Sequence, residues 1–409
     1  MLAELKRVRF PVETGLLLAF CIFLPLVEMP KNLAWLLYVC AWIVNRMRAR
    51  DWGGRWDLWD SLFAAWVASG YLVVVFSGLR GSELGGAHEL ARYAVLGWMV
   101  KRGGYGAREI RWILGALVVS TVAGLAFGYW RLWSGAGKSR MLQLHSVGHV
   151  NHTAIYIAIM FGICVSWTLA RWRSWGAERR ALALAVDALM LVSLIVTASR
   201  GAIGVGLVLL LILALAWWPR WRAPLIGSVV AVALVAAALV LFKIEVIRKQ
   251  NDNAAAQNVL SYRDGIWRMG IAAWERYPWF GVGMDNYSLI SHELVRSWRT
   301  EAGRDFDATH YVRFPHAHSL YVNALAERGA VGFTALAAIL LAWFVALVRR
   351  RPLPSDRDLA WLLWGGAASA WLVTCGVGLV NTTLHHEHGL LAALLLGLWL
   401  STPSTRRAS

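Results

Sequence analysis

The sequence predicts an all-α polytopic membrane protein with about twelve transmembrane helices and one large loop on the outer face. Of its 409 residues, 58% are hydrophobic and 25 are tryptophan, and the mean hydropathy is +0.51, which is too apolar for a soluble globular protein. Apolar runs of about 17–25 residues, long enough to cross a bilayer, recur along the chain. Short basic loops separate many of these runs, as in membrane proteins of fixed orientation.

The expected spans begin near the N-terminus. Eight clear apolar runs lie at 58–79, 111–130, 152–170, 181–198, 201–218, 223–242, 319–348 and 359–379. Four weaker runs lie at 12–27, 33–45, 87–100 and 389–401, and a run this short could also be a re-entrant segment. Lys6, Arg7 and Arg9 before the first run are typical of a signal peptide. Because Glu13 interrupts that run and no small-residue cleavage site follows, we expect an uncleaved first helix.

Basic residues predict the orientation of these spans. With the N-terminus inside, the inside loops are 46–57, 101–110, 171–180, 219–222, 349–358 and the C-terminal tail. Every one carries arginine or lysine, as the positive-inside rule requires. The net charge of +17 is therefore mainly a feature of topology, and we expect no nucleic-acid partner. All four cysteines fall within apolar spans and lack metal-ligand spacing, so neither a disulfide framework nor a structural zinc site is expected.

This topology divides the chain into three parts and places all the histidines at one face. Residues 1–242 are expected to form nine transmembrane helices, 243–317 an outer loop with amphipathic helices, and 318–409 three transmembrane helices. The eleven histidines lie outside or at outer helix ends: His88, His145, His149, His152, His292, His310, His316, His318, His385, His386 and His388. Any chemistry is therefore expected at the outer face.

The large outer loop contains one readable helix. Residues 262–274 have apolar side chains at helical spacing, with Ser261 as a plausible N-cap, and place Arg263 and Trp267 on one face. The proline and paired glycines of 278–283 then end the helix. We expect one or two amphipathic helices on the outer surface and no separate soluble domain.

Four arginines occupy positions where membrane physics makes a charge costly. Arg200 lies between two apolar spans at the start of a helix, so it is expected to face the bundle interior or a watery cavity, where the helix N-terminus adds positive potential. This outlines an anion site, although an arginine reaching lipid phosphate is the alternative. The sequence around Arg263 is a weaker indication of anion binding, and the alternative is that Arg263 lies on a solvated helix face. Arg80 and Arg92 lie at outer helix ends, where a lipid headgroup is their simplest partner.

His318 precedes a membrane helix, where the helix dipole disfavours imidazolium and lowers the pKa. A neutral imidazole near pH 7 suits a general base. Its alternative is a capping or interfacial role. Further along the same helix, Gly329 and Gly332 are expected to permit close helix packing.

Two motifs could hold a metal ion, but none is expected. Asp305 and Asp307 form a short acidic pair in a polar loop, a common arrangement without a metal. The segment His385–His388 has imidazole and carboxylate groups that could ligate zinc or copper, or orient polar groups of a substrate. No Gly-x-Ser-x-Gly element or Walker-type loop is present, so ATP-driven transport has no support.

Together these motifs resemble the O-antigen ligase/polymerase family of lipid-carrier-dependent glycosyltransferases. The resemblance rests on Ser-Arg-Gly at 199–201, Arg-x3-Trp at 263–267, Pro-x-x-Gly-x-Gly at 278–283 and His-Ser-x9-Gly-x-x-Gly at 318–332. These motifs cover roughly 140–335, and the topology covers the whole chain. Within the family, about twelve spans and a histidine followed by Asn, Ser or Gln are typical of the ligases. Because His316 lies near His318 and Arg268 near Arg263, the assignment within each pair rests on spacing only.

The resemblance implies a GT-C-like glycosyltransferase in the bacterial inner membrane, with its active site facing the periplasm. The donor would be an O-antigen glycan on undecaprenyl pyrophosphate, and the acceptor the core oligosaccharide of lipid A. Arg200 and Arg263 would stabilise the departing pyrophosphate, and His318 would deprotonate the acceptor hydroxyl for inverting attack. No cofactor or metal would be required.

Further contacts to lipid A or the donor are expected from Arg80, Arg92, His316 and His386. An O-antigen polymerase and a protein O-oligosaccharyltransferase are alternatives within the family. From another class, a transporter or flippase would use Arg200 as a substrate-binding charge. The sequence disfavours it because no inverted repeat and no broken mid-membrane helix is apparent.

Overall fold

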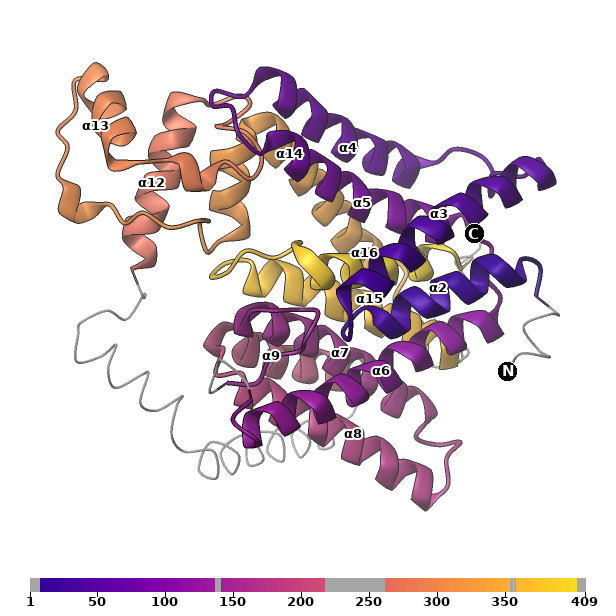
Figure 1. The fold of residues 1–409 in the computed structure, drawn as a ribbon. Helices are drawn as coiled ribbons and strands as arrows, with labels where there is room; N and C mark the ends of the chain where they lie inside the picture. Colours follow the sequence, from indigo (N-terminus) through magenta and orange to yellow (C-terminus); the bar gives the residue numbers. More distant parts are fainter. Residues whose placement is uncertain (1–7, 137–140, 218–261, 354–355, 357, 403–409) are drawn as a thin grey trace.

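All regular structure in the described part of the chain is helical. The computed structural model describes residues 8–136, 141–217, 262–353, 356 and 358–402 (Figure 1). Within them, thirteen α-helices and two short 3₁₀ segments occur and no strand does, which confirms the expected all-α class. The expected span 223–242, the inside loop 219–222, the first part of the large loop, the basic residues of the C-terminal tail, Lys6 and Arg7 lie outside the described residues.

The helices follow the apolar runs closely. Their bounds are α2 (Pro11–Phe23), α3 (Glu28–Ala49), α4 (Leu58–Phe76), α5 (Glu83–Lys101), α6 (Ala107–Trp133), α7 (Val150–Arg171), α8 (Ala177–Val196), α9 (Arg200–Trp217), α12 (Arg263–Arg276), α13 (His292–Glu301), α14 (Leu320–Arg349), α15 (Asp358–Val377) and α16 (His386–Leu400), with 3₁₀ turns at Tyr287–Leu289 and Ala308–His310. Every expected span in the described residues coincides with one of these helices.

Six helices of the described residues are long and apolar enough to cross a membrane. These are α4, α6, α7, α9, α14 and α15, and α2 and α16 are shorter apolar helices. The remaining candidates carry more charge: α8, for example, contains Glu178, Arg179, Arg180 and Asp187. A multi-pass membrane protein is therefore supported, and the full count of about twelve spans stays a prediction.

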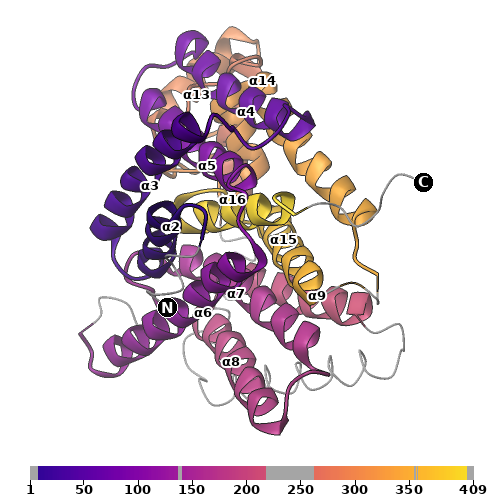
Figure 2. The ribbon, with the colours of Figure 1, turned by 90° about the vertical axis from the view of Figure 1, so that its right-hand side faces the viewer.

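Helix α7 is the centre of the bundle. Of its apolar window, 89% is buried inside the protein, against 72% for α15 and 28% for α9. It packs on α15, α9, α8 and α16, while α16 also packs on α5 and α4 packs on α5 and α14 (Figures 1 and 2). Helices α7 and α15 are thus the most enclosed of these spans, and α9 offers its apolar side chains outward.

The basic loops meet at one end of the bundle. Arg46 donates to the carbonyl oxygen of Gly103 at 2.9 Å, and Arg102 donates to that of Trp52 at 2.6 Å. At the same ends of other helices, Arg171 forms an ion pair with Asp358 at 2.9 Å. Loops 46–57 and 101–110 therefore lie together, as do 171–180 and 349–358, which the expected topology requires.

The outer loop forms a small core of its own. Helices α12 and α13, at the upper left of Figure 1, are the expected amphipathic helices. Their core comprises Ile266, Met269, Ala272, Ala273, Val282, Tyr287, Ile290, Val295, Trp298, Ala317 and Ala326, and the last of these belongs to α14. The expected N-cap at Ser261 is wrong. Tyr262 has φ of 61°, a left-handed backbone that excludes it from the helix, so Tyr262 itself is the N-cap and α12 begins at Arg263.

Candidate functional site

Helix α14 is broken at Gly329, and a turn of the outer loop fills the break. Gly329 has φ of 57° and ψ of −162°, so the helical hydrogen-bond ladder stops there. The N–H groups of Ala330 and Val331 donate instead to the carbonyls of Pro278 and Trp279, at 2.7 and 3.1 Å. We call residues 278–283 the docked turn. The sequence-based expectation that no helix is broken is therefore wrong for α14.

The other half of the interrupted ladder is also satisfied by the docked turn. The carbonyl oxygens of Ala326 and Glu327 lose their partners four residues later in the helix. They accept hydrogen bonds from the N–H groups of Val282 and Gly283, at 2.9 and 3.0 Å. These four hydrogen bonds give backbone partners to groups that would otherwise be unpaired inside an apolar helix. Two of the sequence motifs are thus one structural unit.

Glycine is required on both sides of this junction. A Cβ atom at Gly329 would overlap the backbone of Trp279, and one at Gly281 would overlap the backbone of Glu327. Both residues also have positive φ, which side chains disfavour. Gly329 was expected to let another helix approach closely, but the backbone that approaches it belongs to a loop. At Gly332 a Cβ atom would instead overlap Arg328 of the preceding turn.

His318 lies just before α14, in a left-handed conformation with φ of 49°. Ser319 is the N-cap, and its side chain accepts from the N–H of Val322 at 3.4 Å. The Nδ1 atom of His318 is 3.4 Å from Oδ1 of Asn381, in the segment that follows α15. His318 is therefore oriented from outside its own helix.

The hydrogen bonds of Asn381 select the tautomer of His318. Oδ1 of Asn381 accepts from the N–H of Thr382 at 3.0 Å, so this atom is the acceptor end of the Asn381 amide. An acceptor opposite Nδ1 requires a proton on Nδ1, which leaves Nε2 with a free lone pair in the neutral ring. Burial lowers the pKa of His318 to about 4, the hydrogen bond with Asn381 opposes this, and the charge of Arg263 adds to the lowering. The direction agrees with expectation, but burial rather than the helix dipole is the main cause.

Arg263 and the start of α9 meet the same segment after α15. The Nε atom of Arg263 donates to the carbonyl of Val380 at 2.9 Å. A Cβ atom at Gly201 would lie 2.7 Å from Cγ2 of Val380, so Arg200, its neighbour, begins α9 beside this segment. Burial and then the charge of Arg200 lower the pKa of Arg263, so the two positive charges act on each other beside this segment. Such a pair favours an anion.

Segment 378–384 is therefore the organising element of the site. It contacts His318 through Asn381, Arg263 through its Val380 carbonyl, and the Ser-Arg-Gly motif through the Val380 side chain. The N–H of Leu320 also donates to the carbonyl of Gly378 at 2.8 Å. No sequence signal pointed to this segment, because its contacts are made to residues far away along the chain, 63 positions for His318 and 117 for Arg263.

Spacing alone could not choose between Arg263 and Arg268 or between His316 and His318. The structure separates the two arginines but keeps the two histidines side by side. Arg268 is exposed on α12, whereas Arg263 is half-buried against segment 378–384. His316 lies beside His318, with ring centroids 4.2 Å apart, and its Nδ1 is 3.1 Å from Oγ1 of Thr382. Burial and the neighbouring His318 lower the pKa of His316 to about 3. Both histidines are therefore neutral near pH 7.

A network behind the two histidines holds them in place. The N–H of Ala317 donates to Oδ1 of Asn323 at 2.9 Å, and Nδ2 of Asn323 donates to Glu327 at 2.8 Å. Glu327 also accepts from the N–H of Tyr287 at 3.3 Å. Asn323 and Glu327 are buried on α14, one turn apart, and were missed by the sequence because a polar pair within an apolar run has no motif.

Arg80 and Arg92 lie elsewhere on the outer end. Arg80 donates to the carbonyl of Val75 at 2.9 Å and pairs with Glu83 at 3.6 Å, with 64% of its side chain exposed. Arg92 donates to Asn32 at 2.7 Å. In the described part of the chain, the hydrogen bonds and ion pairs of both arginines go to α3, α4 and α5 rather than to segment 378–384.

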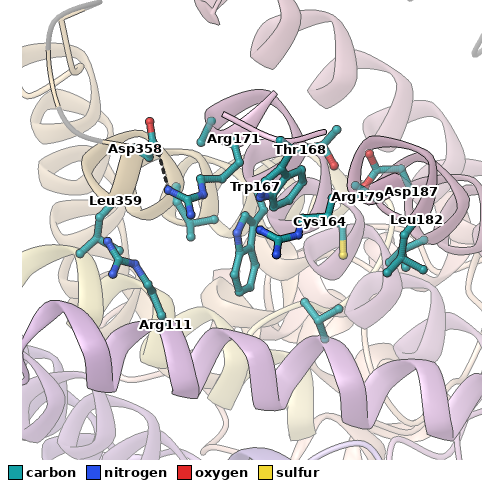
Figure 3. Close-up of a pocket in the computed structure, with 16 residues that line it drawn as sticks. Arg111, Cys164, Trp167, Thr168, Arg171, Arg179, Leu182, Asp187, Asp358 and Leu359 are labelled. Atoms are coloured by element: carbon teal, nitrogen blue, oxygen red, sulfur yellow. Dashed lines mark hydrogen bonds and ion pairs between the residues drawn. The ribbon is translucent and has the colours of Figure 1, made fainter. Parts of the chain in front are cut away.

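Two cavities occur near the bundle ends. One of about 160 Å³ is lined by His316, Thr382, His385, Glu89 and Arg328, among others, and adjoins the candidate site. The larger, of about 490 Å³, is mostly apolar with Arg111, Arg171 and Arg179 around it (Figure 3). Its residues on α7 lie at the helix end opposite His152, roughly 20 to 30 Å away along the axis. The larger cavity therefore belongs to the basic end and not to the candidate site.

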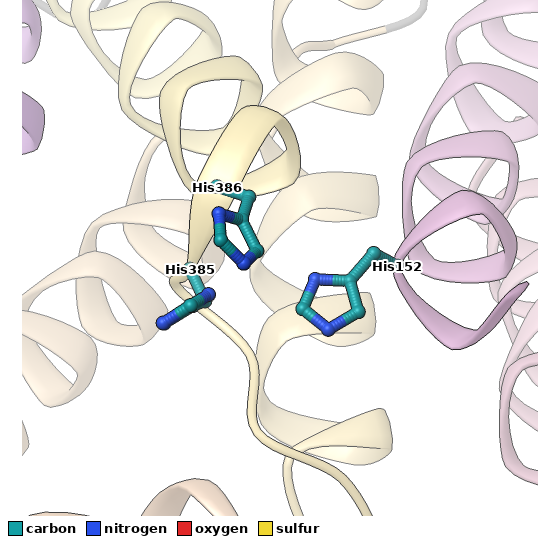
Figure 4. Close-up of side chains that lie close together, drawn as sticks. All are labelled: His152, His385 and His386. Atoms are coloured by element: carbon teal, nitrogen blue, oxygen red, sulfur yellow. The ribbon is translucent and has the colours of Figure 1, made fainter. Parts of the chain in front are cut away.

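His386 lies in a cluster of imidazoles at the start of α16. Its ring centroid is 4.8 Å from that of His152 on α7 and 3.8 Å from that of His385 (Figure 4). His152, at the outer end of α7, was not singled out from the sequence. The acidic pair has structural uses: Asp307 accepts from the N–H of Thr309 at 2.9 Å, and the Asp305 carbonyl accepts from Arg299 at 3.4 Å.

Comparisons with known proteins support the family suggested by the motifs. The O-antigen ligase family model matches residues 185–337, which include Arg200, Arg263, the docked turn and the His318 motif. The exopolysaccharide production protein ExoQ of Rhizobium meliloti (strain 1021) is 27% identical over 188 residues, which are 46% of this chain. The match covers 40% of that protein's own length. The chain is thus a multi-pass membrane protein related to the O-antigen ligase family, as its motifs predict.

Proposed function

We propose that this protein is an O-antigen ligase, which transfers a glycan from undecaprenyl pyrophosphate to the core oligosaccharide of lipid A. The observation that carries the proposal is the meeting of three motifs at segment 378–384. There a neutral histidine with a free Nε2 lies near two arginines held close to each other. A base beside an anion site is what glycosyl transfer from a pyrophosphate donor requires.

His318 acts as the general base in this mechanism. Its Nε2 takes the proton of an acceptor sugar hydroxyl, and the oxygen attacks the anomeric carbon of the donor from the face opposite the pyrophosphate. The bond between that carbon and the pyrophosphate oxygen breaks, the configuration inverts, and the carrier pyrophosphate leaves as an anion. Asn381 keeps the proton on Nδ1, so the basic nitrogen stays available throughout.

Arg200 and Arg263 bind the pyrophosphate in this mechanism. Guanidinium groups bind phosphate oxygens bidentately and stay charged at all relevant pH values. Burial, and after it the charge of Arg200, lower the pKa of Arg263, and an anion bound between the two arginines would relieve their repulsion. Charge on the leaving group grows in the transition state, so these contacts strengthen as the bond breaks. No metal ion or cofactor has a required step.

Further contacts to the two lipids are proposed at the outer end of the bundle. Arg80, with an exposed side chain, and Arg92 would contact lipid A phosphates. His316 and His386 border the smaller cavity and the imidazole cluster, where they would contact sugar hydroxyls. The site would face the periplasm from the bacterial inner membrane, because all the basic loops of the described residues lie at the other end.

The test is a transfer reaction with purified full-length protein in detergent. With carrier-linked glycan and lipid A-core, a larger lipid-linked product should form in the presence of EDTA and without ATP. His318→Ala and Arg263→Ala should each lower kcat/KM by at least about 100-fold, a usual size for a lost base or oxyanion contact. His310→Ala and Arg268→Ala, both exposed residues of the same loop, are the matched controls and should retain activity.

Activity retained in both site variants would refute the mechanism, even if ligation itself were observed. Transport is the alternative from another class, and the single break in α14 removes one argument against it. A transporter would move glycan across proteoliposomes and form no new glycosidic bond. The absence of any product would therefore refute the ligase proposal.

A polymerase is the second candidate function. It is favoured by the relative ExoQ, whose name describes exopolysaccharide production. In that reaction a second carrier-linked glycan replaces lipid A-core as acceptor, while the roles of His318 and the arginines are unchanged. Supplying each acceptor alone separates the two activities: only carrier-linked acceptor yields longer carrier-linked chains.

A further inference from the structure

Three histidines from two helices converge at the outer end of the bundle. His152 lies in the first turn of α7, His385 immediately precedes α16, and His386 is the first residue of α16. One ring nitrogen from each lies within 4.8 Å of the others, and Figure 4 shows the ring of His386 between those of His385 and His152. Neither the proton transfer nor the pyrophosphate binding proposed above involves these three histidines, and only His386 is proposed there as a contact to sugar hydroxyls.

Buried ring nitrogens in this group have no hydrogen-bond partner among the described residues. They are Nδ1 of His152, Nδ1 of His385 and Nε2 of the neighbouring His388. Buried polar atoms are almost always paired, so an unpaired one calls for an explanation such as an ion or ordered water. Two of these atoms belong to the converging histidines, and such unpaired imidazole nitrogens point to a ligand that accepts electron pairs from neutral rings.

The second ring nitrogen of His385 lies opposite a carboxylate. Its Nε2 lies 3.9 Å from Oε2 of Glu89, a residue of α5 that lines the adjoining cavity. Histidines that bind a metal through one nitrogen usually donate from the other to a carboxylate, which fixes the ring and strengthens the ligand. With Nδ1 as the ligand atom, Nε2 of His385 faces this carboxylate, and a shift of about 1 Å would bring the two within hydrogen-bond distance.

We propose that His152, His385 and His386 bind a divalent transition metal ion, with Zn²⁺ as the best match. Zinc is bound by neutral imidazole nitrogens at about 2.0 to 2.1 Å, and three histidines with an open fourth position form a known coordination set. Tetrahedral geometry places donor atoms roughly 3.3 Å apart, so the rings need to close by about 1 to 2 Å. His386 is exposed and free to make this adjustment.

The metal would join α7 to α16 beside the smaller cavity. It would not replace His318, whose contacts are made to Asn381 rather than to this group. The site is thus a structural or regulatory addition to the outer end, and its existence does not depend on which acceptor the enzyme uses.

Metal binding can be measured without any activity assay. Full-length protein, purified through a tag that contains no histidine and stripped with EDTA, is dialysed against buffered free Zn²⁺ and its metal content is determined by mass spectrometry. We expect one equivalent per chain at saturation. In His152→Gln and His386→Gln the affinity should fall at least tenfold, and Glu89→Gln should weaken it roughly 10- to 100-fold. His310→Gln, an exposed histidine of the outer loop, is the control and should bind as the wild type does.

A second measurement guards against misfolded variants. Because a metal that binds only the native state raises the unfolding temperature, Zn²⁺ should stabilise the wild type and His310→Gln but not His386→Gln. The metal-free unfolding temperatures of all three should agree, since the His386 side chain is exposed. Substoichiometric binding in the wild type, or unchanged affinity in His386→Gln together with His152→Gln, would overturn the proposal.

Discussion

Lowering the pH should inhibit glycosyl transfer only far below the range in which an ordinary histidine titrates. His318 must be neutral to accept a proton, and burial lowers its pKa to about 4. A lowered pKa means that the neutral form persists as the pH falls. The acid limb of kcat/KM, which reports the free enzyme, should therefore have its midpoint near this value.

The expected difference is large within an accessible pH range. A base with a pKa of about 4 is roughly 90% neutral at pH 5. A base with the unperturbed pKa of about 6.5 would be only about 3% neutral at that pH. Between pH 7.5 and pH 5, kcat/KM should therefore fall by less than about 1.2-fold for His318, against roughly 30-fold for an unperturbed histidine.

The assay is ligation by purified protein at subsaturating donor between pH 4.5 and 7.5. Samples held at the lowest pH and returned to pH 7 must regain full activity, so that unfolding is separated from titration. His316→Gln should leave the profile in place, because that residue is not the base. A reversible midpoint near 6.5 in both proteins would show that burial does not control the base, and the reasoning would fail.

Three further changes test parts of the site. Gly329→Ala should cost about 1 to 3 kcal/mol from backbone strain alone and lower the unfolding temperature, whereas Gly85→Ala, in open space on α5, should not. Asn323→Ala removes the acceptor for the N–H of Ala317. Because Asn323 positions His318 indirectly, kcat should fall about 10- to 100-fold with little change in KM. A loss of stability as large as the loss of activity would contradict this positioning role. Arg263→Lys keeps the charge but not the fork geometry, so donor KM should rise about tenfold in steady-state assays, and an unchanged KM would count against bidentate phosphate binding.

The sequence was sufficient to predict most helices but not how α14 is built. A run of apolar residues at 319–348 reads as one span, because glycine is common in membrane helices and its sequence context does not reveal its φ. The break at Gly329 depends on backbone hydrogen bonds from the docked turn, some 50 residues earlier. The motif that contains Gly329 could therefore be recognised in the sequence, whereas the structural reason for this glycine required the structure.

At the candidate site too, the sequence revealed local motifs but not the contacts between distant segments. Ser-Arg-Gly, Arg-x3-Trp and His-Ser are short local patterns, so candidates for the anion site and the base could be recognised without a structure. Asn381 carries no comparable pattern, and its contact with His318 joins positions 63 residues apart. Similarly, the histidines of the imidazole cluster come from helices α7 and α16, and the packing of these two helices cannot be predicted from their local sequences.

Donor binding and base strength should be coupled through Arg263. The positive charge of Arg263 helps to lower the pKa of His318 in the free enzyme. A pyrophosphate bound to Arg263 would neutralise that charge, so the pKa of His318 should rise and the imidazole should become a stronger base when the donor is present. The acid limb of kcat, which reports the enzyme–substrate complex, should therefore lie at higher pH than that of kcat/KM. In Arg263→Gln the two limbs should move together, because the charge that links them is gone. Coincident limbs in the wild type would show that the donor does not approach Arg263.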